Sequence, residues 1–408
     1  MGDFLRYNML MDKDENVSSS SFGTEQIANP SLAEPSKDNE GDNASSETRH
    51  SHKKTIIIVL IVLLIIVAGG VIFFIVNNGN KKEEAPVEAN ASEEETVKQP
   101  DKEEIEEEKE EQEEEQVAKT AILPKGMVLN EKLYKIAGNK AGDRGEINNN
   151  VTAIKRAKEL PEDKKSRDYD ITDNDSDMPV YLWYEKNTRT AYFYSDAKII
   201  YADEDFEGAF EFMEALSDIS GLTEIDVSRV KNMGRLFSFD KNIKSIQALE
   251  GWDTSNVELA SNLFFGNTKL TNISALRKWN TSKIQDFSDM FSGCENLSDI
   301  SALSDWNTRS LTMTTGMFSG MSKLENISAL KNWDMSNVYH ASGMFGDDEL
   351  LKDLSPIAKW NVGKLEYAYG LFRNTGVEDA TVLNSWNTSS LKLKEDMFDS
   401  GVKVPKWY

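Results

Sequence analysis

The strongest constraint on this chain is a tryptophan that returns at a fixed step through its C-terminal half. Successive tryptophans are 27 residues apart from Trp252 to Trp360, and the next follows after 26, at Trp386. Phenylalanine keeps the same step from Phe210 to Phe398. A regular repeat of this length is typical of a solenoid, in which each unit buries its apolar side against its neighbours. A stacked array is first of all a long surface, so the repeat favours binding over catalysis.

Apolar columns and turn-forming residues give each unit a predicted shape. Asp253-Thr-Ser and Asn280-Thr-Ser place side-chain oxygens where they can fix a turn. The hydroxyl ahead of Met-Phe, as at Ser288, suggests a helix of one or two turns. Strands of successive units would stack in parallel about 4.8 Å apart. The predicted fold is an α/β repeat solenoid, similar to leucine-rich repeats, with short parallel strands and short helices.

Two of the columns admit a second interpretation. The tryptophans could form a ladder on which sugars stack, but their invariance within the array favours packing. The Asx column could bind a metal if its oxygens converged. Its mixture of Asp253, Asp334, Asn280 and Asn307 favours a role in turns.

Charge is concentrated in one segment of the chain. The net charge is −24, and residues Glu83–Glu115 hold 17 acidic residues and 3 lysines, a net of −14. Like charges repel one another, so residues 77–120 are predicted to be an extended acidic stalk. No basic stripe exists, which argues against nucleic acid as a partner.

An apolar segment precedes the stalk. The 22 residues Thr55–Val76 carry no charge and would span roughly 33 Å as a helix, enough to cross a bilayer. Arg49, Lys53 and Lys54 precede it, which by the positive-inside rule favours a cytoplasmic N-terminus. We therefore expect a single-pass membrane protein with its repeats outside the cell.

These boundaries divide the chain into five regions. Residues 1–54 are polar without a sustained period and are predicted to be a disordered cytoplasmic tail. The transmembrane helix (55–76) and the stalk (77–120) follow. Residues 121–198 are predicted to cap the open end of the solenoid, which occupies residues 199–408.

The predicted cap contains two features of note. Two aromatic strands flank a turn at residues 186–188. Asp173, Asp175 and Asp177 alternate as in a calcium loop, but Met178 and Tyr184 stand where an EF-hand needs Gly and Glu. A polar loop is the better interpretation.

Residue types that commonly form disulfides, metal sites or catalytic groups are scarce in this chain. One cysteine, Cys294, allows no disulfide within the chain, and it occupies a repeat position held elsewhere by Asn267, Met321 and Asp348. Only three histidines are present, which argues against a histidine metal site. No catalytic grouping is evident, so we predict a non-enzyme with no cofactor and no metal.

The repeat W-[DN]-x-S-x-V…[ML]-F…L-x-x-I-x-x-L closely resembles the 26-residue-repeat branch of the BspA-like leucine-rich-repeat surface proteins of bacteria. The match lies in WDTSNV (252–257), DMFSGC (289–294) and LENISALKNWDMSNV (324–338). The lead-in YFYSDAKIIYADED (192–205) is also similar. The resemblance covers about half the chain and implies an extracellular solenoid that acts as an adhesin or surface antigen. It carries over no ligand-binding residues.

Two functions are left open by the sequence. The first is a membrane-anchored binding or adhesion surface for a protein or glycan on a host or neighbouring cell. The alternative is a structural protein of the cell envelope without a specific ligand.

One group of residues departs from the repeat columns and is the candidate binding site. Positions that meet a ligand are free to diverge, whereas positions that pack repeat their residue type. Tyr339, His340, Tyr367 and Tyr369 bring aromatic side chains to two adjacent units, of the kind enriched at interfaces. Ordinary surface drift in the C-terminal units is the competing interpretation.

Overall fold

The structure, a computed structural model, describes residues 119–138 and 148–408. The predicted tail (1–54), membrane span (55–76) and all but the end of the stalk (77–120) lie outside the described residues. Within the part that is described, no helix has both the length and the apolarity needed to cross a bilayer.

The first sheet joins the start of the described chain to the first turn of the repeats. β1 (Thr120–Ile122), β5 (Ile199–Tyr201) and β6 (Ile225–Asp226) are parallel, in the order β1-β5-β6. α4 (Gly126–Ile136) follows β1 and buries Leu129 and Leu133. Its first residue must be glycine, because a Cβ on Gly126 would lie 2.2 Å from a backbone oxygen of the adjoining turn.

The second sheet contains the two aromatic strands that the sequence predicts. β3 (Tyr181–Glu185) and β4 (Thr190–Tyr194) are antiparallel around residues 186–189, which confirms the hairpin. β2 (Ala153–Arg156) lies parallel to β4 on its other side, and η2 (Glu162–Lys164) is a short 3₁₀ helix in the connection that follows. The amide of Ile154 donates to the carbonyl of Asp218 in the repeats, so the sheet continues into the solenoid.

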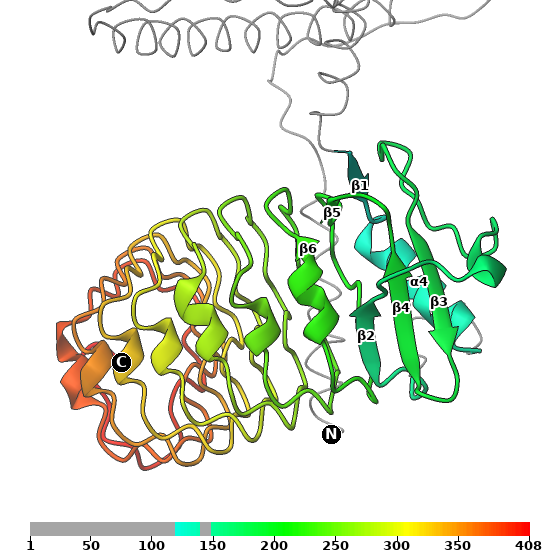
Figure 1. Cartoon of the computed structure of the whole chain (residues 1–408). Helices are drawn as coiled ribbons and strands as arrows, with labels where there is room; N and C mark the ends of the chain where they lie inside the picture. The colour runs from blue at the N-terminus through cyan, green and yellow to red at the C-terminus, as the bar shows by residue number, and fades with distance from the viewer. Residues whose placement is uncertain (1–118, 139–147) are drawn as a thin grey trace, which may run out of the picture. The chain divides into compact units, whose positions relative to one another are not determined.

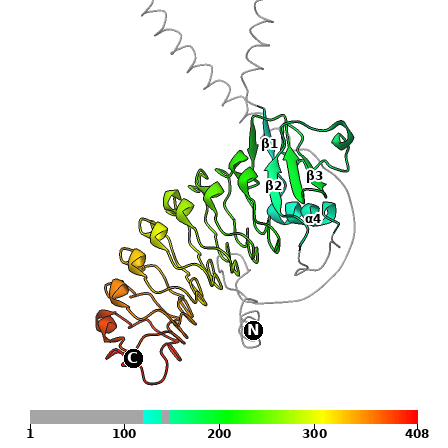
Figure 2. The same cartoon turned by 60° about the horizontal axis from the view of Figure 1, so that its bottom comes forward.

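The repeats form a solenoid whose turns each contain one short 3₁₀ helix. Figures 1 and 2 show these helices in a row along one side of the stack. The helices are η3 (Ser220–Glu224), η4 (Gln247–Leu249), η5 (Ser274–Lys278), η6 (Ser301–Leu303), η7 (Ser328–Leu330), η8 (Ser355–Ile357) and η9 (Thr381–Ser385). The prediction of a repeat solenoid with short helical turns is confirmed.

The position of the helix within the unit differs from the prediction. The Ser288-Asp-Met-Phe segment forms tight turns, and the helix lies instead after the isoleucine column, at Ser-Ala-Leu. An Asx side chain starts it: Asp299 Oδ1 accepts the amide of Ser301 at 2.8 Å, and Asn326 Oδ1 accepts that of Ser328 at 2.8 Å. The Asx-Ile-Ser sequence is therefore a capping motif.

The predicted parallel strands are shorter than expected. Beyond β6, parallel pairing within the described repeats is reduced to single-residue bridges, which continue from Asp205 through His340 to Leu393. Two residues in nearly every turn have positive φ, which bends the chain away from an extended path. One such column contains Asn262, Asp289, Gly316, Gly343 and Gly370. Asn, Asp and Gly tolerate this conformation best.

The tryptophan and phenylalanine columns are the core of the stack. The tryptophans are only 4–6 % exposed, so they pack and do not offer a sugar ladder. Each indole Nε1 donates to a carbonyl of the preceding turn, as Trp306 does to Leu276 at 3.0 Å. Neighbouring phenylalanine rings stack at 5.4–6.0 Å from Phe210 to Phe398.

The last residues continue the tryptophan column out of register. Trp407 follows Trp386 after only 21 residues, yet their rings stack at 6.1 Å. Its Nε1 donates to the carbonyl of Leu383 at 2.8 Å, as the other indoles do. Trp407 thus covers the ring of Trp386, which would otherwise face solvent.

One column inside the core carries polar side chains. The buried Asp348 accepts the amide of Met321 through Oδ1 at 2.7 Å, while its Oδ2 has no partner. Burial raises the pKa of Asp348 well above its usual range. Asn267 accepts the amide of Asp240 in the same way, at 2.8 Å. Cys294 in this column is buried, which raises the pKa of its thiol to about 12, so it is an inert packing residue.

Replacing a central tryptophan should destabilise the array. We expect Trp306→Ala to lower the free energy of unfolding by about 3–5 kcal/mol, the usual effect of emptying a buried aromatic site. Trp306→Phe keeps most of the packing and loses the bond to the Leu276 carbonyl, so its effect should be smaller. Urea denaturation of the two variants tests this. An unchanged midpoint for Trp306→Ala would contradict a packing role.

Replacing Asp348 should make the stability of the protein less sensitive to a rise in pH above about 4. The raised pKa means that the folded state keeps a proton that the unfolded state has lost, so stability falls as pH rises above the unfolded pKa. Asp348→Asn keeps the Met321 bond and carries no charge. Its advantage over the wild type should grow from near zero at about pH 4 to about 1–3 kcal/mol at about pH 8, as expected for a buried unpaired polar group.

A matched control for this variant is Asp299→Asn. The amide and hydroxyl of Ser301 hold the pKa of Asp299 below its usual range, so this substitution should not stabilise the protein at high pH. Parallel curves of melting temperature against pH for the wild type and Asp348→Asn would contradict the prediction.

Candidate functional site

The single-residue β-bridges between successive turns define one face of the solenoid, and we call this series the bridge ladder. His340 pairs with Met313 on one side and with Tyr367 on the other. The amide of Tyr339 donates to the carbonyl of Thr312 at 3.0 Å, and that of Ala341 to the carbonyl of Tyr367 at 2.9 Å. These bonds fix the backbone, so the side chains along the ladder keep a constant register from turn to turn.

The structure brings together three of the four candidate residues. The rings of Tyr339 and His340 lie 6.3 Å apart, and those of His340 and Tyr367 lie 5.1 Å apart at 50°. Tyr339 is the outermost of these, with 39 % of its surface exposed, whereas the other aromatic columns are buried. We call Tyr339, His340 and Tyr367 the aromatic group.

Tyr369 does not join these three. Its ring contact is with Arg373, whose guanidinium carbon lies 6.0 Å from the ring centroid. Lys392 lies at the same distance from the ring of Tyr367, at the C-terminal edge of the aromatic group. The group is therefore bordered by a cation, and Tyr369 belongs to a separate contact.

Burial favours the uncharged forms of two side chains of the aromatic group, His340 and Tyr339. Burial lowers the pKa of His340, and its Nε2 lies 3.2 Å from the hydroxyl of Ser342. Partial burial, followed by the negative charge of Asp286, raises the pKa of Tyr339. Both shifts favour uncharged rings with hydrogen-bonding edges at His340 and Tyr339, which suit stacking and hydrogen bonding to a ligand.

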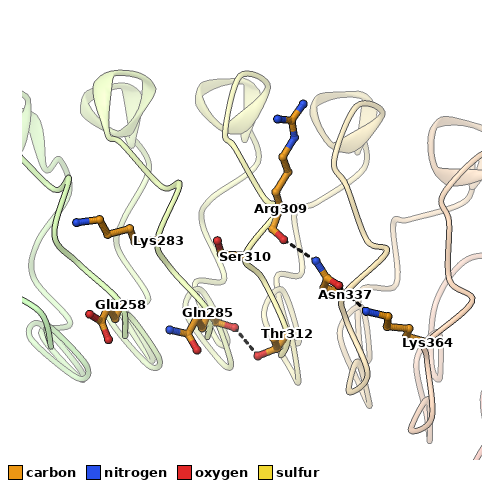
Figure 3. Close-up of a pocket in the computed structure, with 8 residues that line it drawn as sticks. All are labelled: Glu258, Lys283, Gln285, Arg309, Ser310, Thr312, Asn337 and Lys364. Atoms are coloured by element: carbon orange, nitrogen blue, oxygen red, sulfur yellow. Dashed lines mark hydrogen bonds between the residues drawn. The ribbon is translucent and has the colours of Figure 1, made fainter.

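A polar groove adjoins the aromatic group. It has a volume of about 620 Å³. Glu258, Gln285 and Thr312 form one row of its lining, and Tyr339 is the next residue in their repeat column. Figure 3 shows this row on successive turns, with Lys283 and Arg309 nearer to the short helices. We call this surface the polar groove.

Three cations line the polar groove, and ion pairs elsewhere do not neutralise them. Lys283, Arg309 and Lys364 are exposed. None of the three belongs to an ion pair among the described residues. The ion pairs in the column of Glu258, Lys231–Glu204 (2.6 Å) and Lys392–Glu366 (2.7 Å), lie outside the lining of the groove. Glu258 is the one carboxylate in the lining given by the described residues. The groove is therefore positive on a chain of net charge −24.

The groove lysines are held by asparagines of the preceding turn. Lys283 Nζ donates to Asn256 Oδ1 and Lys364 Nζ to Asn337 Oδ1, both at 2.7 Å. Asn337 Nδ2 in turn donates to the carbonyl of Arg309 at 2.8 Å. The ammonium groups are thereby placed on the surface with donors to spare, because an ammonium has three N–H groups.

Comparison with known proteins gives one family, and it covers the repeats. A family model described as "Mycoplasma protein of unknown function, DUF285" matches residues 204–326 and again residues 296–406. The solenoid carries two DUF285 matches. No curated protein and no solved structure matches the chain.

The DUF285 matches include both candidate surfaces. The aromatic group lies in the second match, and the polar groove extends through both. The segment Thr120–Tyr201, which holds most of the cap, precedes them. The expectation of a repeat family is confirmed at this level, while the match is not specific to the BspA-like branch.

Sequence reasoning missed the polar groove and its lysines. The signal was a column that reads Asn256, Lys283, Ser310, Asn337 and Lys364 in successive repeats. Such a column resembles ordinary surface variation until the structure shows that each lysine bonds the asparagine one turn earlier.

An acidic pair near the ladder was also missed. Burial, and then the charge of Asp286, raises the pKa of Asp289 to about 7. Asp289 is at a left-handed position that most other units fill with Gly, Asn or Asp, and its carboxylate covers Gly316, where a Cβ would lie 2.2 Å from Oδ1. The left-handed turn at this position explains why Asp289 is found there. Within residues 119–138 and 148–408 no cluster of three metal-binding side chains occurs.

The acidic loop of the cap has structural roles. Asp173 Oδ1 accepts the amide of Asp175 at 3.0 Å, and Asp177 Oδ2 accepts the hydroxyl of Thr120 at 2.9 Å. Asp177 thus ties the loop to β1.

Proposed function

We propose that this protein is a membrane-anchored extracellular repeat protein whose solenoid binds a partner on a host or neighbouring cell. The observation that carries the proposal is the aromatic group. The phenylalanine column from Phe210 to Phe398 and the tryptophan column turn inward, whereas Tyr339 is 39 % exposed beside an open groove. Exposed aromatic side chains on a rigid scaffold are characteristic of binding surfaces.

The sequence supports the membrane part of the proposal. Residues 55–76 have the length and apolarity of a bilayer span, with basic residues before them. The acidic segment 77–120 would hold the solenoid away from the membrane. The resemblance of the repeat to BspA-like surface proteins agrees with adhesion.

The second candidate is a structural role in the cell envelope. The continuous aromatic stack favours it, because a rigid array can space two layers without a specific ligand. Binding measurements separate the two candidates, since only the first requires a partner outside the cell's own envelope.

The topology has a direct test. Protease added to intact cells should remove the repeats, because we propose that residues 80–408 are outside the cell. Immunoblotting against the solenoid before and after lysis measures this. Repeats that are protected in intact cells and cleaved only after lysis would place them in the cytoplasm.

The aromatic group has its own test. Tyr339→Ala combined with Tyr367→Ala should abolish most binding of the full-length protein to host or neighbouring cells. Stability should fall by no more than about 1 kcal/mol, as is usual at partly exposed positions. Binding by flow cytometry and thermal melting give the two readouts.

The matched control is Leu350→Ala with Val382→Ala. These side chains are 45 % and 40 % exposed and lie outside the aromatic group. Equal binding by the two double variants would remove the aromatic group from the binding surface. Binding to the cell's own envelope alone would favour the structural role.

A further inference from the structure

The polar groove holds three positive charges along the solenoid, none of which belongs to an ion pair among the described residues. Lys283, Arg309 and Lys364 come from successive parts of the array, so their charges recur along its axis. Glu258 lies at the end of the row furthest from Tyr339 in the repeat order. A site with repeated cations along one direction attracts a ligand whose negative charges are also repeated.

The rest of the lining is suited to hydroxyl groups. Between the cations lie the side chains of Gln285, Ser310, Thr312 and Asn337, which are neutral and can donate or accept hydrogen bonds. The eight residues of the lining include no aliphatic or aromatic side chain. A peptide with apolar anchor residues would therefore find no pocket here.

The backbone amides along the row of Gln285, Thr312 and Tyr339 are already paired between turns and are not open to a peptide strand. The amide of Gln285 donates to Glu258 O at 2.9 Å, and that of Thr312 to Gln285 O at 2.8 Å. The amide of Tyr339 continues the series at 3.0 Å to Thr312 O. Strand addition requires free backbone donors and acceptors, so recognition here must come from side chains.

Tyr339 adds an apolar surface at one end of the groove. It follows Thr312 in the same column and lies two residues after Asn337, which lines the groove. In the two preceding turns the residues at the same two positions, Lys283 with Gln285 and Ser310 with Thr312, all line the groove, which places Tyr339 on the groove side of its own turn. An exposed tyrosine ring can pack against the C–H face of a sugar ring, while its hydroxyl bonds to the sugar hydroxyls.

We propose that the polar groove binds an acidic polysaccharide, with the carboxylate or sulfate groups on Lys283, Arg309 and Lys364 and one sugar ring against Tyr339. This deepens the proposed function and rests on it, because it names the chemical class of the cell-surface partner. Carboxylated and sulfated polysaccharides share the property that the groove would recognise, a hydroxyl-rich chain with regularly spaced anions. Carboxylated and sulfated chains are two sources of it.

The test uses the full-length protein in nanodiscs of phosphatidylcholine, which carries no net charge. Heparin serves as the sulfated probe, hyaluronate as the carboxylated probe and dextran as the neutral one. We expect binding to at least one acidic probe and none to dextran. Lys283→Gln combined with Lys364→Gln should weaken that binding by about 10- to 100-fold, as expected for two lost charged contacts.

The chain offers a closely matched control. Lys269 and Lys323 donate to Asn242 Oδ1 and Asn296 Oδ1, both at 2.5 Å, in the same kind of contact and outside the groove. Lys269→Gln with Lys323→Gln therefore removes equal charge and equal hydrogen bonding. It should leave the affinity within about twofold of the wild type, since long-range charge effects are screened at physiological salt. Melting temperatures of both variants verify folding.

Each outcome decides the proposal. Absence of binding to both acidic probes, or equal weakening in the two lysine pairs, would overturn it. Tighter binding of poly-glutamate than of either polysaccharide would also overturn it and assign the groove to acidic peptides. If the groove variant keeps full binding to cells while the Tyr339 and Tyr367 variant loses it, the groove proposal fails and the proposed function stands.

Discussion

The stacking of identical rings from turn to turn is the interaction on which the solenoid depends. Phenylalanine rings 5.4–6.0 Å apart set the spacing of the turns. The indole of each tryptophan satisfies a carbonyl of the preceding 3₁₀ helix. Because both contacts repeat at every unit, a residue's position in the unit determines its place on the surface. The aromatic group and the polar groove are consequences of that register.

Much of the fold was predictable because packing repeats residue types. The tryptophan, phenylalanine and aliphatic columns, and the hairpin at residues 181–194, followed directly from sequence periodicity. The position of the 3₁₀ helix did not, because a Ser before Met-Phe and a Ser after Asx-Ile offer similar caps. An Asx side chain accepts the serine amide at both places, Asp286 that of Ser288 and Asp299 that of Ser301, so this local contact does not distinguish them. α4 was missed although Leu129 and Leu133 have helical spacing.

The candidate site was predictable only where it broke a column. Tyr339, His340 and Tyr367 replace other residue types in columns that lie beside one another, so divergence identified them correctly as neighbours. Tyr369 breaks a column too, but it contacts Arg373, and sequence alone gives no direction for its side chain. The groove cations were invisible because lysine and asparagine are ordinary surface residues. Their meaning depends on contacts between turns.

The lysine–asparagine contacts also limit how such an array can change in length. In the column Asn242, Lys269, Asn296, Lys323, each lysine needs an asparagine one turn before it. Duplicating a lysine-bearing unit by itself would set two ammonium groups on adjacent turns and leave the second without its amide acceptor. Duplicating an asparagine unit together with its lysine unit preserves every contact. Along this edge, a lysine-bearing turn can therefore be added only together with an asparagine-bearing turn before it.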